Sequence, residues 1–99
     1  MRKAYPVFFT AVDGAVLIEV PDLQILTEGT TDLVNAIDMA RDAMELACVS
    51  MADARETIPA PSDIFTLDIS KGVFSEEGKT IISLIDIDLS GYGKHQPIR

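Results

Sequence analysis

Three acidic residues, Glu19, Asp86 and Asp88, are the best candidates for chemistry in this sequence. Asp86 and Asp88 alternate with isoleucine, which is typical of a strand, and residues at i and i+2 of a strand project from one face. Carboxylates clustered in this way could hold the magnesium ions of a nuclease. Half-exposed strands show the same alternation without any metal. We therefore expect solvated acids, no cofactor or metal, and no enzymatic activity.

The single histidine and the single cysteine offer little further chemistry. His95 lies near the C-terminal end with no nucleophile placed beside it, so we expect a solvated residue rather than a general base. We expect Cys48, at the margin of an apolar helical stripe, to be a half-buried packing residue. One cysteine allows neither an internal disulfide nor a cysteine-based zinc site, which is typical of a cytoplasmic protein.

Net charge limits the kind of partner that the chain can bind. The chain carries −8, and sixteen acidic but four basic residues lie between Ala4 and Gly91, which gives that body a net charge of −12. Tyr5, Phe8 and Phe9 could stack on RNA bases, but stacking usually accompanies a positive groove. The acidic body disfavours direct DNA binding and favours a basic protein partner. RNA binding by a locally uneven surface stays open as the alternative.

The composition is that of one small domain without a membrane segment. The chain has 99 residues, of which 47% are hydrophobic, enough for a single core. The short apolar run after Lys3 contains Pro6 and Thr10, so it does not have the pattern of a signal peptide. No apolar stretch approaches the roughly 18 residues of a membrane helix. We expect no membrane association.

The first third of the chain has the pattern of a three-stranded antiparallel meander. Asp13-Gly14 predicts a tight hairpin turn, because both residue types tolerate positive φ. Pro21 ends the second strand, since proline cannot donate to a ladder. The predicted strands are residues 5–12, 15–20 and 24–27, the last of them short and at an edge.

A long amphipathic helix follows Gly29, with a threonine as its cap and Asp32 at the positive end of its dipole. Its apolar stripe recurs every three or four residues: Leu33, Ile37, Ala40, Met44, Ala47 and Met51. Residues 58–62 form a stiff proline-containing connector, residues 65–74 are mixed, and residues 80–89 predict a last strand.

The order β-β-β-α-β predicts an α+β domain over residues 1–90. A right-handed crossover through the helix would place the last strand parallel to the first, at the centre of the sheet, with the helix on one face. The opposite face would carry Leu17, Ile82 and Leu84 and remain uncovered, which makes it a candidate interface. We expect residues 91–99 to be a basic linker or tail without a DNA-binding element.

Several short motifs resemble, in their order and spacing, the HicB-type antitoxin family. They are Tyr5-Pro6-Val7-Phe8-Phe9-Thr10, Val20-Pro21-Asp22-Leu23, Thr27-Glu28-Gly29, Ala36-Ile37-Asp38-Met39-Ala40-Arg41-Asp42-Ala43, Ile58-Pro59-Ala60-Pro61-Ser62 and Ile85-Asp86-Ile87-Asp88-Leu89. The resemblance implies a partial RNase H-like fold, self-association as a homodimer or larger, and binding of a small basic ribonuclease toxin (HicA-like). The family usually adds a C-terminal DNA-binding element, and from the resemblance we expect this sequence to be either a truncated form or a branch without one.

The first strand favours an inhibitor over a nuclease. An RNase H-like enzyme would normally project a carboxylate from the middle of that strand, and residues 5–12 contain none. We expect an antitoxin of a type II toxin–antitoxin pair, with Glu19, Asp22 and Glu28 contacting the toxin. The alternative is an RNA- or nucleic-acid-binding module of RNase H-like shape without catalysis.

Overall fold

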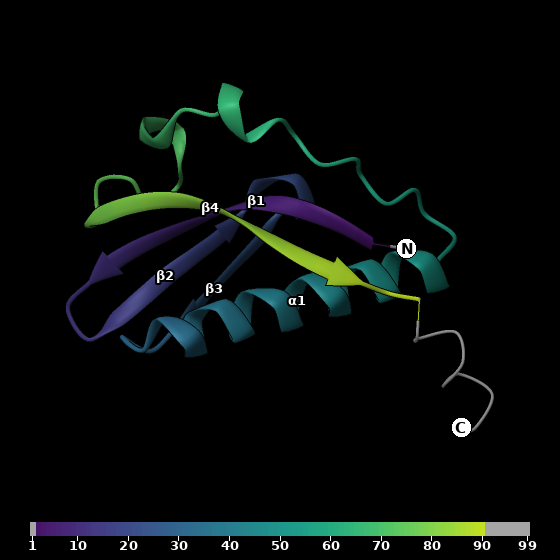
Figure 1. Cartoon of the computed structure of the whole chain (residues 1–99), viewed down its shortest axis with the longest axis horizontal. Coiled ribbons are helices and arrows are strands. Elements are labelled where there is room, and N and C mark those ends of the chain that lie inside the picture. Colours follow the sequence, from purple (N-terminus) through teal and green to yellow (C-terminus); the bar gives the residue numbers. More distant parts are fainter. Residues whose placement is uncertain (1, 91–99) are drawn as a thin grey trace.

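The computed structural model describes residues 2–90, which form one four-stranded antiparallel sheet with a long helix across one face (Figure 1). The strand order in the sheet is β3-β2-β1-β4. In chain order the elements are β1 (Arg2–Val12), β2 (Ala15–Val20), the 3-10 turn η1 (Pro21–Leu23), β3 (Ile25–Gly29), α1 (Leu33–Asp53), the 3-10 turns η2 (Ile64–Thr66) and η3 (Ile69–Lys71), and β4 (Lys79–Asp88). The α+β class, the meander and the single long helix are confirmed.

The last strand differs from the prediction in both direction and place. β4 runs antiparallel to β1, with Tyr5 opposite Ile85 and Phe9 opposite Ile81, and it lies at an edge of the sheet. The cause is residues 54–78, hereafter the connector. Helix α1 carries the chain back along the sheet once, and the connector carries it back again over the other side (Figure 1). This extra pass reverses the direction of β4. The prediction of a parallel, central last strand is therefore wrong, and the RNase H-like strand arrangement is not found.

Strand β1 is central and buried on both faces. Tyr5 and Phe9 point toward α1, whereas Phe8 and Thr10 point toward the connector, and all four are buried. The Thr10 and Thr80 hydroxyls share a hydrogen bond of 2.7 Å, which satisfies the buried polar group. Pro6 is tolerated in this central strand because the pairing of β1 with β2 begins only at Phe8.

The helix buries its small and flexible residues against the sheet. Asp32, rather than a threonine, caps α1: its carboxylate accepts from the Val34 backbone N–H at 3.0 Å. Ala36 and Ala40 bring the helix close to the sheet. Together the helix and sheet form one apolar core of Tyr5, Val7, Phe9, Val16, Ile18, Val20, Leu23, Ala36, Ala40, Met44, Cys48, Ile85 and Ile87.

Across residues 2–90, no helix combines the length and the hydropathy that crossing a membrane requires. The expected basic tail, residues 91–99, lies outside the described residues, as does His95.

Candidate protein-docking surfaces

Two of the three acids predicted to contact a partner, Asp22 and Glu19, form hydrogen bonds to the connector. Asp22 accepts hydrogen bonds from the backbone N–H of Ser62 at 2.7 Å and from its hydroxyl at 2.6 Å. Glu19 accepts from the backbone N–H of Val73 at 2.8 Å. Contact with a partner would require these carboxylates to give up or share those bonds. Glu28, on the edge strand β3, is exposed.

The predicted apolar sheet face exists, but it is not uncovered. In the register, Leu17 lies opposite Thr10 and Ile82 opposite Phe8, which places them with Leu84 on the face away from α1. The connector crosses this face, where η2 and η3 both contact β4. Leu17 and Ile82 are half-buried, while Leu84 is 49% exposed. The expectation of an open face is therefore wrong.

The approach of the connector to this face is close. A Cβ atom added at Gly72 would lie 2.6 Å from Cδ2 of Phe8, so glycine is required for the backbone to pass over the ring. Residues 65–74 mix apolar and polar side chains because this part of the connector packs one side against the sheet and exposes the other. Leu67 and Phe74 turn inward and are half-buried, while Phe65 is 93% exposed.

The acids considered for metal binding are separated and otherwise engaged. Asp86 accepts from Nη2 of Arg2 at 2.9 Å and from Nη2 of Arg41 at 3.2 Å, and these hydrogen bonds lower the pKa of its carboxyl group. The backbone N–H of Ser90 donates to Asp88 at 2.9 Å and lowers the pKa of that carboxyl. Within residues 2–90, no three histidine, cysteine or acidic side chains are grouped so that they could hold a metal ion. The lack of enzymatic activity stays a prediction.

The side chains considered for stacking and for thiol chemistry belong to the interior. Burial raises the pKa of Cys48, a fully buried thiol rather than the half-buried residue that we expected. Tyr5 donates its hydroxyl to the carbonyl oxygen of Pro59 at 2.6 Å, and burial raises its pKa. Since Phe8 and Phe9 are also buried, the aromatic residues of β1 offer no exposed platform for RNA bases.

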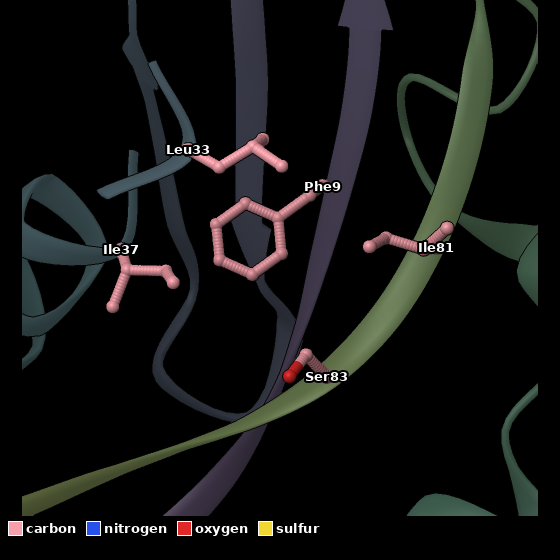
Figure 2. Close-up of a pocket in the computed structure, with 5 residues that line it drawn as sticks. All are labelled: Phe9, Leu33, Ile37, Ile81 and Ser83. Carbon is pink, nitrogen blue, oxygen red and sulfur yellow. The ribbon is translucent and has the colours of Figure 1, made fainter. Parts of the chain in front are cut away.

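An apolar hollow opens on the face of the sheet that α1 covers, between the start of α1 and the start of β4. Figure 2 shows Phe9 at its centre, with helical and β4 side chains on opposite sides. It has a volume of about 90 Å³ and is lined by Phe9, Leu33, Ile37, Ile81 and Ser83. Leu33 and Ile81, which line the hollow from α1 and β4, are 59% and 58% exposed.

The sequence pattern did not predict this hollow. Leu33 and Ile37 fitted the buried stripe of the helix, and Ile81 fitted a strand that is apolar on both sides. The hollow lies at the first turns of the helix, whereas farther along α1 the Arg41 side chain reaches the backbone of Asp86 in β4. The available signal was Ile81-Ile82, two adjacent apolar residues on opposite faces of a strand.

Comparison with known proteins gives a fold likeness. No protein-family model matches the chain. No curated protein matches its sequence either. Among solved structures, the chain is similar to a chain of a toxin–antitoxin complex from Streptococcus pneumoniae, with a TM-score of 0.80 and 23% sequence identity. The match covers 100% of this chain and 78% of that chain, and at this identity it establishes a common fold.

Proposed function

We propose that this chain is a HicB-type antitoxin, which binds a small basic ribonuclease toxin of HicA type in the cytoplasm and neutralises it without catalysis of its own. The observation that carries the proposal is the fold likeness, over the whole of this chain, to a chain of a toxin–antitoxin complex. Occlusion of the toxin, rather than chemistry on it, is the mechanism that we infer. Self-association as a homodimer or larger is part of the proposal.

Charge supports a basic partner. Residues 2–90 contain sixteen acidic and six basic residues. Many of the acidic side chains are exposed, and they include Glu28, Asp38 and Asp42. A surface of this sign attracts a basic protein at long range and speeds its association, and added salt weakens the attraction.

A binding and inhibition experiment tests the proposal. The chain is mixed with the small basic product of the adjacent reading frame, and the mixture is followed by gel filtration at low and at physiological salt. We expect a stable complex at low salt and loss of the partner's RNA cleavage at equimolar ratio. The partner alone and an unrelated acidic protein of similar size serve as controls. Absence of both complex and inhibition contradicts the proposal.

A further inference from the structure

The outer edge of β4 presents backbone groups with no strand partner within residues 2–90. The two-residue turn between β1 and β2 makes Val12 and Ala15 a hydrogen-bonded pair. Bonded and non-bonded positions alternate along antiparallel ladders, so the even-numbered residues of β1 bond to β2 and the odd-numbered ones to β4. In β4, the backbone N–H and C=O groups of Ile82 and Leu84 consequently point outward.

The contact between Arg41 and β4 agrees with this assignment and limits the open stretch. Nε of Arg41 donates to the backbone carbonyl of Asp86 at 3.0 Å, and Asp86 has the same parity as Ile82 and Leu84. The guanidinium therefore covers the edge at Asp86. Residues 80–85 remain open.

Residues 80–85 lack the charged residue, proline and bulge that usually protect an edge strand. Exposed edges are normally blunted by charged residues, proline or a bulge. The sequence Thr-Ile-Ile-Ser-Leu-Ile has no charge and no proline, and its pairing with β1 is continuous. The other edge strand, β3, has five residues and carries Glu28. β4 is thus the longer and less protected of the two edges.

The apolar hollow adjoins this edge. Ile81 and Ser83 line the hollow from β4, and Ile81 forms an exposed rim with Leu33 across the gap. Neighbouring strands lie about 4.8 Å apart, with directly opposite side chains on the same face. An added strand would therefore place a side chain beside Ile81 or Ser83 over the hollow.

Charges around the edge favour a basic occupant over a second copy of this chain. Glu76 and Glu77 precede β4, and Asp38 lies one helical turn from Val34 with 69% of its side chain exposed. Lys79 and Arg41 are the opposing charges, and Arg41 pairs with Asp38 at 4.0 Å and with Asp86 at 3.2 Å. The described part carries sixteen acidic and six basic residues, so this edge attracts a basic segment more strongly than a second acidic copy, and the proposed self-association would use another surface.

We propose that the outer edge of β4, over residues 80–85, docks an extended basic segment of a partner protein. The segment adds to the sheet as a further strand and inserts an apolar side chain into the hollow. Backbone hydrogen bonds then supply the affinity and the hollow supplies the specificity, as in other cases of strand addition. The inference rests on the proposed function, because a basic toxin is the partner that we expect.

Amide hydrogen exchange in the intact chain tests strand addition directly. Exchange is measured with the chain alone and with the small basic product of the adjacent reading frame. The Ile82 and Leu84 amides should exchange rapidly in the free chain and at least about tenfold more slowly in the complex. Leu26, whose amide points outward from β3 by the same alternation, is the matched control and should not change.

A pair of substitutions tests the hollow. Leu26 and Ile81 are 57% and 58% exposed on the two edge strands, and asparagine leaves the net charge of either site unchanged. Ile81→Asn should weaken binding by at least about tenfold, and Leu26→Asn by less than about twofold. Thermal unfolding of both variants checks that they fold. The exchange measurement uses the unmodified chain and does not depend on the folding of either variant.

The outcomes separate this inference from the proposed function. A complex that leaves the Ile82 and Leu84 amides in rapid exchange overturns docking at β4 but not the antitoxin role. Failure to form any complex contradicts both. Protection of these amides in the chain alone, rising with its concentration, identifies a second copy as the occupant and overturns the inference.

Discussion

The two faces of the sheet are covered by different means. Toward α1, Ile18 and Met44 are fully buried in a continuous apolar core. On the other face, Leu17 and Ile82 are half-buried under a connector that hydrogen bonds hold at Ser62 and Val73. Apolar burial contributes about 25 cal/mol per Å², whereas a hydrogen bond contributes on the order of 1 kcal/mol net. The helical face should therefore supply most of the stability, and the other face should mainly position the connector.

Adjacent residues of β2 give the largest test of this difference. Ile18 points toward α1 with 0% exposure, and Leu17 points toward the connector. Ile18→Ala should lower the free energy of unfolding by about 2–5 kcal/mol, because it leaves a cavity in a packed core. Leu17→Ala should cost less than about half as much. Urea unfolding of both variants measures the two values, and equal losses would mean that the faces contribute alike.

A smaller effect is expected where Asp22 holds the connector. Asp22→Ala removes both acceptors of Ser62 and should cost on the order of 1 kcal/mol, mostly as local opening. Chymotrypsin should then cleave after the exposed Phe65 several-fold faster, while the urea midpoint changes little. Asp42→Ala, at an exposed helical position, is the control. Unchanged cleavage would show that the Asp22 bonds do not hold the connector.

The smallest effect concerns the ion pairs of Asp86 at the edge of the sheet. Its hydrogen bonds to Arg2 and Arg41 lower its pKa in the folded chain below the unfolded value of about 3.9. The contribution of Asp86 to stability is therefore present above that pH and is lost as the pH falls through the folded pKa. The stability difference between Asp86→Asn and the unmodified chain should be largest near pH 7 and should shrink as the pH falls below about 3.9. A constant difference across this range would contradict the prediction.

Local sequence patterns predicted the elements well. The turn at Asp13-Gly14, the alternation of residues 15–20 and the helical stripe each depend on neighbours within a few positions, and each element is found. The first strand is longer than predicted, because Arg2 pairs with Asp88 at the far end of the chain. Residues 2–4 have no strand pattern of their own that would reveal this pairing.

Features that depend on distant segments were not predictable in the same way. The direction of β4 depends on the path of the connector, whose sequence has no period to show that it recrosses the sheet. From the sequence, Asp22 and Glu19 were expected to be exposed acids. Their hydrogen-bond partners, Ser62 and Val73, are distant in sequence, and no local pattern predicts these contacts. The hollow at Ile81 depends on the spacing between α1 and β4, which side-chain packing sets.

The pairing of Arg2 with Asp88 has a consequence for synthesis of the chain. β1 can pair with β2 as soon as both have left the ribosome, but its other side must wait until β4 emerges. Throughout that interval β1, which is central in the complete sheet, is an exposed edge strand of the partly synthesised sheet. Contacts so far apart in sequence also form late in folding. The most protected strand of the mature protein is thus the one most open to misassembly during translation.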